Sequence, residues 1–300
     1  MNFLLIFLLN TFFISCIAPS EKTYSFTKFE TRYETFGQGE PILIINGGPG
    51  FNSEGFAFIA QEIADLGYKT IIYDQRGTGG SKLDVVNSET ITMDLMVQDI
   101  EDLRKKLKIE KWVVFGHSFG GILATHYAAK YPKQIKKLIF SSSGGVNMNF
   151  RTYLQGRINN NMTKEQRDSL NYYQKKLDAG DNSVRTIYKR ASFLANAYVY
   201  YKGNAPTIAA RLPQIDFKVN SLVIQDLDKI KYNYLNKFPD FKQPVLIIQG
   251  KNDIISVETA EEIKQTFHNS KLVLLDNCGH YGWLDRKDIY MRAIASFLNN

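Results

Sequence analysis

The stretch FGHSFGG (Phe115–Gly121) places one serine hydroxyl among glycines, between the apolar run KWVV and the amphipathic run ILATHYAAKYP. A tight turn from a strand into a helix forces its central residue into strained backbone angles. The residues two positions away on either side must then be small, and Gly116 and Gly120 meet this requirement around Ser118. Such a turn raises the serine Oγ above the sheet and points the N-terminus of the helix at it. Ser118 is therefore the candidate nucleophile.

Apolar runs and helical patterns alternate on both sides of this turn. Strands are expected at residues 41–47, 69–74, 111–116, 135–143, 244–250 and 271–276. Helices are expected at residues 53–68, 92–109, 120–132, 256–267 and 286–298. This alternation predicts an α/β fold, with a mostly parallel central sheet and helices on both of its faces.

The alternation stops after about Gly145, and helical signals dominate until about Phe241. We therefore expect a core formed by residues 16–145 and 242–300, with a helical cap inserted at residues 146–241. Thr163 and Gln166 have the spacing of a capping box. Further candidate N-caps are Ser53, Ser183 and Asn220.

The composition narrows the class of function. The chain has 300 residues, of which 44% are hydrophobic and 22% charged, as expected of a folded protein with one core and an insertion. Its net charge is +7, but it has no block of Lys and Arg and no zinc-finger or RNP signature, which argues against a nucleic-acid partner. No metal-ligand motif is present, so we expect neither a metal nor a cofactor. The expected partner is a small-molecule or short-peptide substrate.

A serine at neutral pH needs a base, and the base needs an acid that orients it. His280 follows the last expected strand in a loop with glycine, where the chain order serine, acid, histidine requires the base. Asp253 lies in the loop after the strand at residues 244–250 and is the candidate acid. The other histidines, His117, His126 and His268, are interpreted as structural.

A second glycine-rich loop, NGGPG (Asn46–Gly50), follows the first buried strand. Glycines allow backbone N–H groups to face inward, and Pro49 stiffens the turn. This loop is the expected source of one donor to the oxyanion that forms when a serine attacks a carbonyl group.

NGGPG, DQRGTGGS (Asp74–Ser81), GHSFGG, GKND and CGH occur in an order that resembles the prolyl aminopeptidase (proline iminopeptidase) family of α/β-hydrolases. The resemblance covers roughly residues 40–145 and 243–285. It implies that Gly48 and Phe119 supply the oxyanion N–H groups. The same resemblance implies that four residues brace the loops without reacting, although the first stands where the family usually has histidine: Asn46, Pro49, Asp74 and Arg76.

The cap departs from this family, whose peptidases hold the free amine of the substrate with cap glutamates. Residues 151–220 contain one glutamate, Glu165, and twelve Lys and Arg against five Asp and Glu, a net charge of +7. The basic residues include Arg151, Arg157, Arg185, Lys189 and Arg190. They alternate with Tyr153, Tyr172, Tyr173, Tyr188, Tyr198, Tyr200 and Tyr201. The hypothesis that follows is an aromatic pocket with a cation at its rim, suited to a substrate carboxylate on the leaving-group side.

The residues and the resemblance together predict a serine hydrolase that acts through an acyl-enzyme on Ser118. An aminopeptidase acting on short peptides is the first expectation, and a carboxylesterase acting on small esters is the second. The third is a non-catalytic, lipid-anchored binding protein on the same scaffold.

The first residues, MNFLLIFLLNTFFISC, carry no charge and are too short to cross a bilayer comfortably. Residues 1–15 are typical of a secretory signal peptide. FISC is similar to a bacterial lipobox, which would make Cys16 the lipidated first residue of the mature chain. The sequence therefore predicts an exported bacterial protein, periplasmic or membrane-anchored as a lipoprotein, that meets the membrane only through Cys16.

Overall fold

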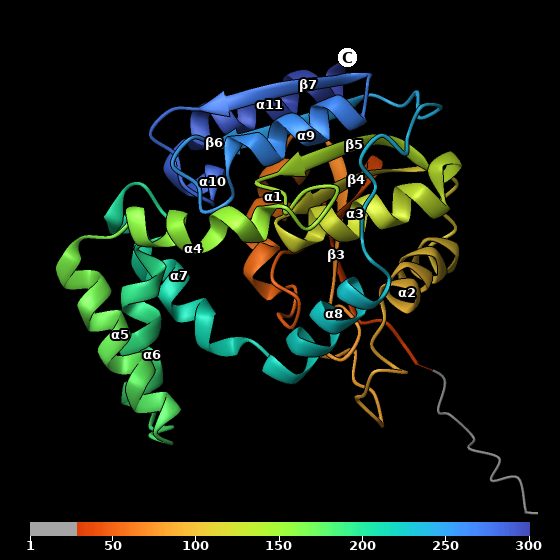
Figure 1. The fold of residues 1–300 in the computed structure, drawn as a ribbon. Helices are drawn as coiled ribbons and strands as arrows, with labels where there is room; N and C mark the ends of the chain where they lie inside the picture. Colours follow the sequence, from red (N-terminus) through yellow and green to blue (C-terminus); the bar gives the residue numbers. More distant parts are fainter. Residues whose placement is uncertain (1–28) are drawn as a thin grey trace, which may run out of the picture.

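A seven-stranded sheet forms the centre of the computed structural model, which describes residues 29–300 (Figure 1). The strands lie in the order β1-β3-β2-β4-β5-β6-β7, and every neighbouring pair is parallel except β1 with β3. They are β1 (Tyr33–Phe36), β2 (Glu40–Ile45), β3 (Tyr68–Tyr73), β4 (Trp112–His117), β5 (Ile135–Ser141), β6 (Val245–Gly250) and β7 (Ser270–Leu275). The predicted mostly parallel sheet is confirmed. Strand β1, a short and partly exposed edge strand, was not expected from the sequence.

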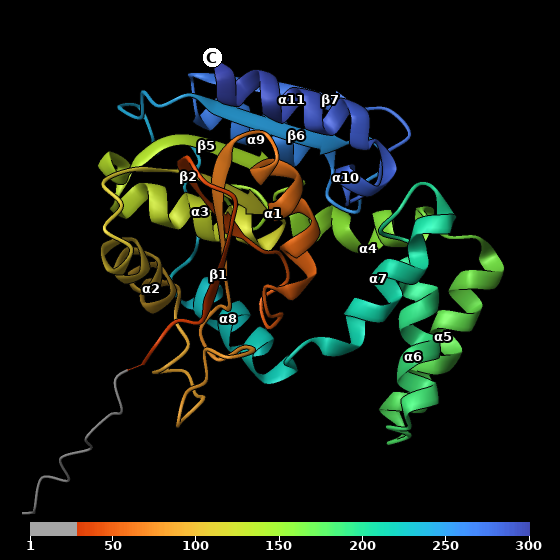
Figure 2. The ribbon, with the colours of Figure 1, turned by 180° about the vertical axis from the view of Figure 1, so that it is seen from behind.

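Helices cover both faces of the sheet, as Figures 1 and 2 show from opposite sides. One face packs against α2 (Met93–Lys106), α3 (Phe119–Lys130) and α9 (Val257–Thr266). The other face packs against α1 (Ala57–Ala64) and α11 (Lys287–Asn299), with the short α10 (Gly282–Asp285) beside them. Strands β4 and β6 are buried at every position because they have neighbours on both sides and helices on both faces. This explains why their sequences are apolar without alternation.

Five helices lie between β5 and β6, in the segment that we call the cap (residues 146–241). They are α4 (Phe150–Asn160), α5 (Lys164–Asp178), α6 (Val184–Ala195), α7 (Ala205–Arg211) and α8 (Phe217–Lys229). Within these described residues, the sole β-type pairing is an isolated bridge between Asn147 and Asn233. Figure 1 shows α5 and α6 projecting side by side away from the sheet, while α8 returns toward α2.

Local capping follows the sequence in two of the four places where it was expected. Thr163 and Gln166 form the predicted capping box of α5, and the Ser183 side chain caps α6. Ser53 is the N-cap residue of the short 3-10 helix Glu54–Phe56, but its side chain makes no capping bond, and the prediction for Asn220 was wrong. Asp216 caps α8, and the Asn220 side chain donates to the backbone oxygen of Pro49 at 2.8 Å.

The N-terminal predictions lie outside the part of the chain that the structure describes, because Cys16 and residues 1–15 precede residue 29. Among residues 29–300, none of the helices combines the length and the apolar character needed to cross a membrane.

Candidate active site

Ser118 occupies the sharp turn between β4 and α3, with φ 53° and ψ −120°. A positive φ is strained for a residue with a Cβ, and the two flanking glycines explain how the chain tolerates it. A Cβ on Gly116 would lie 2.5 Å from the backbone oxygen of Gly120. A Cβ on Gly120 would lie 2.1 Å from the backbone oxygen of Ile45. The strand and the helix therefore pass so closely that only glycine fits at both positions, as the sequence predicted.

His280 and Asp253 meet although 27 residues separate them in the chain. The Nδ1 atom of His280 lies 2.7 Å from Oδ1 of Asp253, which is fully buried. The same carboxylate accepts hydrogen bonds from the Ile255 backbone N–H at 2.9 Å and from the Gln249 side chain at 2.9 Å. These bonds orient the carboxylate, which in turn holds Nδ1 of His280 and leaves Nε2 for a proton on the other side of the ring.

The loop that carries His280 is held by the cap. The backbone N–H of His280 donates to the backbone oxygen of Tyr198 at 2.7 Å. Asp285, buried in α10, accepts from the Gly279 N–H at 2.8 Å and from the Tyr200 N–H at 2.7 Å. Sequence reasoning missed Asp285 because most of its partners are backbone N–H groups, and those of the cap lie about 85 residues away in the chain.

The loop that carries Asp253 is held by the cap as well. Arg157, on α4, donates from Nε to the Asp253 backbone oxygen at 2.9 Å and from NH2 to the Lys251 backbone oxygen at 2.7 Å. Arg157 therefore has a structural role beside the acid, rather than the rim position expected for the basic residues of the cap.

The glycine-rich loop after β2 lies next to Ser118. Gly48 has φ 61°, and a Cβ there would lie 2.3 Å from the ring of Phe51. Gly48 and Phe119 both line one cavity together with Ser118. The Asn46 side chain donates to the backbone oxygens of Gly47 and Phe51, both at 3.2 Å, which holds the loop closed.

Asp74 braces the neighbouring loop. It accepts hydrogen bonds from the Ser53 N–H and hydroxyl, both at 2.8 Å, and from the Gly80 N–H at 2.8 Å. Burial opposes its ionisation, but the hydrogen bonds from Ser53 and Gly80 prevail and lower the pKa of Asp74. The Ser53 hydroxyl therefore donates to Asp74 and makes no capping bond to the helix that follows.

Arg76 forms a bidentate ion pair with Asp99 of α2, in which Nε and NH2 lie 2.8 Å and 2.5 Å from the two carboxylate oxygens. Burial raises the pKa of Asp99 to about 6, against the lowering effect of Arg76. Asp74 and Arg76 thus tie the loop after β3 to its surroundings. Neither lines the cavity.

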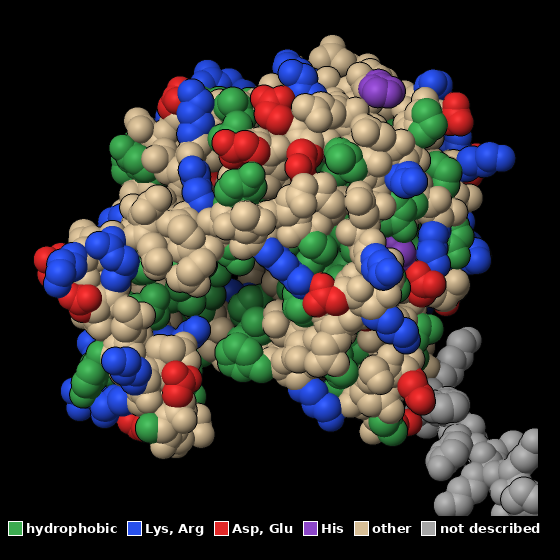
Figure 3. Space-filling view, in the orientation of Figure 1, with side chains coloured by type: hydrophobic (Ala, Val, Ile, Leu, Met, Phe, Trp, Pro, Cys, Tyr) green, Lys and Arg blue, Asp and Glu red, His purple; other side chains and the backbone are tan. Residues whose placement is uncertain are grey.

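A cavity of about 660 Å³ opens above Ser118 between the core and the cap. Ser118 and His280 both line it, and most of its wall is apolar. Figure 3 shows hydrophobic side chains gathered in the hollow between the projecting cap helices and the body of the molecule. Among the described residues that line the cavity, the side chains with a permanent charge are Arg190 and Arg211, and none is aspartate or glutamate.

Of the five basic cap residues selected from the sequence, the structure places only Arg190 in the cavity lining. Arg151 pairs with Asp228 at 2.6 Å, while Arg185 and Lys189 are exposed. Of the seven cap tyrosines selected from the sequence, Tyr198 lines the cavity. The exposed ones are Tyr153, Tyr172, Tyr188, Tyr200 and Tyr201.

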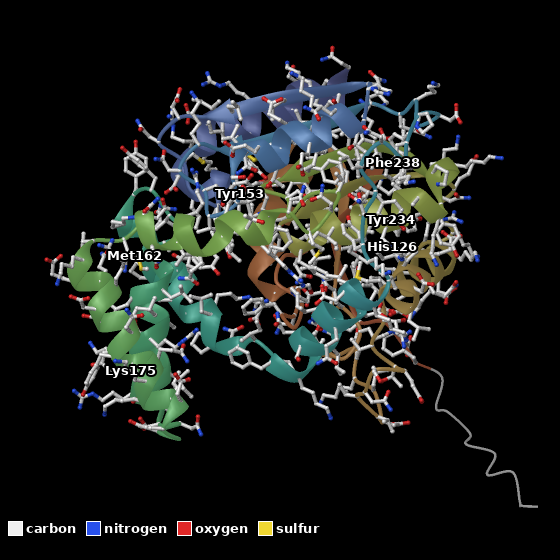
Figure 4. All side chains as sticks on the ribbon, viewed as in Figure 1. His126, Tyr153, Met162, Lys175, Tyr234 and Phe238 are labelled. Atoms are coloured by element: carbon white, nitrogen blue, oxygen red, sulfur yellow. The ribbon has the colours of Figure 1, made fainter. Side chains whose placement is uncertain are left out.

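The remaining histidines have other surroundings. His126 lies between the Tyr234 hydroxyl and the Asp94 carboxylate, each at 2.7 Å from a ring nitrogen, with Tyr234 beside it in Figure 4. His268 is exposed.

His117 lines the cavity next to Ser118, and burial together with nearby His280 lowers its pKa well below the ordinary value, so its ring is neutral. Residues 29–300 contain no cluster of side chains that could hold a metal ion.

The chain and its fold are similar to those of known proteins. Over residues 40–287 the chain matches the alpha/beta hydrolase fold family. It is 25% identical to a proline iminopeptidase of Saccharolobus solfataricus, over 89% of this chain and 87% of that protein. The structure is similar to an esterase from Exiguobacterium antarcticum (TM-score 0.68, 18% identity, 90% of this chain and 96% of that one). It is also similar to a proline iminopeptidase from Mycobacterium smegmatis (TM-score 0.67, 20% identity, 91% and 96%). The chain belongs to the α/β-hydrolase fold family and is a hydrolase of that fold.

Proposed function

We propose that this protein is a serine hydrolase that cleaves an ester or amide bond through an acyl-enzyme. The observation that carries the proposal is the meeting of a strained, cavity-lining Ser118 with a cavity-lining His280 whose Nδ1 is held by Asp253. Nucleophile, base and orienting acid are the three parts that a serine needs in order to attack a carbonyl group.

In the proposed reaction, Ser118 Oγ attacks the carbonyl carbon while Nε2 of His280 takes the hydroxyl proton. The resulting oxyanion accepts hydrogen bonds from the backbone N–H groups of Gly48 and Phe119. His280 then donates the proton to the leaving group, which leaves the acyl group on Ser118. A water molecule, deprotonated by His280, attacks the acyl carbon and releases the acid. Asp253 keeps His280 oriented and stabilises its positive charge throughout.

Two observations bear on the bond that is cleaved. The cavity wall gives no carboxylate to a free α-amino group, and burying an unpaired ammonium is costly. This favours a substrate without a free amine, so a carboxylesterase acting on small esters is our first candidate. The resemblance to proteins named proline iminopeptidase supports the second candidate, an aminopeptidase acting on short peptides.

Labelling and kinetics test the proposal together. A fluorophosphonate should label the wild-type protein and not Ser118→Ala, and kcat should fall by about 10⁴- to 10⁶-fold in that variant. p-Nitrophenyl butyrate and the p-nitroanilides of proline and alanine then separate the two candidates. Faster turnover of the anilides would favour the aminopeptidase. Equal labelling of both proteins would refute Ser118 as the nucleophile, and the absence of both labelling and turnover in the wild type would favour a binding protein on this scaffold.

We also propose that the protein is exported and anchored through a lipidated Cys16, on the strength of its N-terminal sequence. A cysteine with several acyl chains attaches stably to a membrane, whereas one chain binds only marginally. Mass spectrometry of the mature N-terminus should find acylated Cys16 as the first residue. An unmodified N-terminus at another residue would contradict this.

A further inference from the structure

Arg190, on α6, lines the cavity with guanidinium N–H groups that have no hydrogen-bond partner among residues 29–300. Its side chain is half-buried and lines the cavity wall. Nε donates to the Gln174 side chain at 2.5 Å. The other two guanidinium nitrogens, NH1 and NH2, have no hydrogen-bond partner among residues 29–300. An arginine has five N–H donors in a planar fork, so the part that is left matches one carboxylate.

The charge of Arg190 is also uncompensated at short range. No carboxylate of the described chain lies within 4.0 Å of it, although Asp178 is close enough to act on it electrostatically. Burial lowers the pKa of Arg190, but an arginine stays protonated at neutral pH. A cation that is partly removed from water gains from an ionic partner, so Arg190 can pair with an anion that comes from outside the chain.

Arg211 contributes the second positive charge but has its donors occupied. Its NH1 donates to the side chains of Asn52 at 2.6 Å and Gln214 at 2.5 Å, and NH2 donates to the Asn52 backbone oxygen. Its guanidinium also lies 5.1 Å from the centre of the Phe51 ring. Arg211 therefore clamps α7 to the loop after β2. All of these partners are uncharged, so its charge still adds to the positive potential of the cavity.

The position of Arg190 indicates which part of a substrate it would meet. Arg190 acts electrostatically on Tyr198, whose ring lies 5.6 Å from the ring of His280. Burial raises the pKa of Tyr198, so its phenol is neutral. Arg190 and Tyr198 line the same cavity, and Tyr198 packs against His280, so we infer that Arg190 lies on the side where the leaving group would take up its proton.

We propose that Arg190 binds a carboxylate on the leaving group of the substrate, and this rests on the hydrolase function proposed above. A carboxylate fits better than a phosphate because one guanidinium fork matches its two oxygens, and the rest of the described wall is mostly apolar. The substrate class is then an ester, or an amide without a free amine, whose released alcohol or amine carries an acid group.

A matched pair of esters tests this directly. 4-Butyryloxybenzoate and its methyl ester share the same acyl group and differ only in the charge of the leaving group. The wild-type protein should hydrolyse the acid with a kcat/KM about 10- to 100-fold higher, mostly through KM, as one charge-assisted pair predicts. Arg190→Gln should remove this preference by slowing the acid alone. Arg190→Lys should keep part of it, because the charge stays but the fork is lost.

The control variant is Lys189→Gln, which removes an exposed positive charge from the same helix. It should leave the preference intact, whereas an equal loss in Lys189→Gln and Arg190→Gln would point to a diffuse field and overturn the proposal. Equal hydrolysis of acid and methyl ester by the wild type would overturn it too. So would a preference for the anion on the acyl side, measured with p-nitrophenyl hemiglutarate against p-nitrophenyl pentanoate.

A binding measurement separates this proposal from the proposed hydrolysis. Calorimetry should show 4-hydroxybenzoate binding to Ser118→Ala at least 10-fold more tightly than methyl 4-hydroxybenzoate. Arg190→Gln in that background should abolish the difference. Binding without turnover by the wild type would refute the hydrolase and retain the anion site, whereas turnover without selective binding would refute the anion site alone.

Discussion

At the scale of single residues, His117, the neighbour of the proposed nucleophile Ser118, shows how its surroundings control charge. Nδ1 of His117 lies 3.3 Å from the Ser141 hydroxyl, which accepts a hydrogen bond from the Tyr290 hydroxyl at 2.7 Å. The rings of His117 and His280 are only 4.7 Å apart. A charged His117 would repel the imidazolium that the proposed reaction forms on His280, so a neutral ring at this position favours the reaction.

Because the ring of His117 is neutral in the folded protein, the free energy of unfolding should depend on pH. Its folded-state pKa lies below the ordinary value, so the unfolded chain binds a proton that the folded chain does not. The free energy of unfolding should therefore fall as the pH drops below about 6.5, by about 1.4 kcal/mol per pH unit for this histidine. His126, whose pKa is also lowered by burial, adds to the effect.

Urea denaturation at pH 7.5, 6.5 and 5.5 measures this dependence. His117→Asn should show a shallower fall than the wild type, while His268→Asn, at an exposed site, should match the wild type. Identical slopes in His117→Asn and the wild type would mean that His117 takes up its proton in the folded state.

At the scale of elements, the cap holds the loops that carry Asp253 and His280 as well as covering them. Asp285 of α10 binds the N–H groups of Tyr200 and Tyr201, at 2.7 and 3.2 Å, and the Asn204 side chain at 3.0 Å. The same carboxylate binds the Gly279 N–H, next to His280. The segment between α6 and α7 and the loop after β7 therefore share one buried anchor.

Removing this anchor should displace His280. Asp285→Ala leaves several buried donors unpaired, which should cost about 2–4 kcal/mol in the free energy of unfolding. At temperatures where the variant stays folded, we expect kcat to fall by about 10- to 100-fold, because the base is no longer held in place.

Thermal melts and ester kinetics on Asp285→Ala check both effects. Asp288→Ala is the matched control, because Asp288 is an exposed acid three residues away that pairs only with Arg292 among the described residues. A folded Asp285→Ala with wild-type kcat would show that the His280 loop keeps its position without the anchor.

At the scale of the whole molecule, parallel strands bring the site together. The loops that follow β2, β4, β6 and β7 carry Gly48, Ser118, Asp253 and His280. Carboxyl ends of parallel strands meet at one edge of a sheet, so residues far apart in the chain converge there. The cap then covers this edge, and its helices supply part of the apolar wall and both arginines of the cavity. The core thus provides the proposed chemistry, and the cap provides the proposed selection of substrate.

The sequence by itself determined the fold and the candidates for nucleophile, acid and base. It could do so because strands, helices and the serine turn follow from local patterns, and because chain order assigns one residue to each loop of a parallel sheet. Asp253 and His280 were selected in this way, and the structure brings them together at 2.7 Å.

Only the tertiary structure decided which cap residues face the cavity. Arg157, Lys189 and Arg190 look alike in the sequence, yet Arg157 supports the acid loop, Lys189 is exposed and Arg190 lines the cavity. A short amphipathic helix specifies which side is buried, but what lies against that side depends on contacts with distant segments. The sequence did not reveal Asp285 for the same reason, since most of its partners are backbone N–H groups, which every residue type except proline carries.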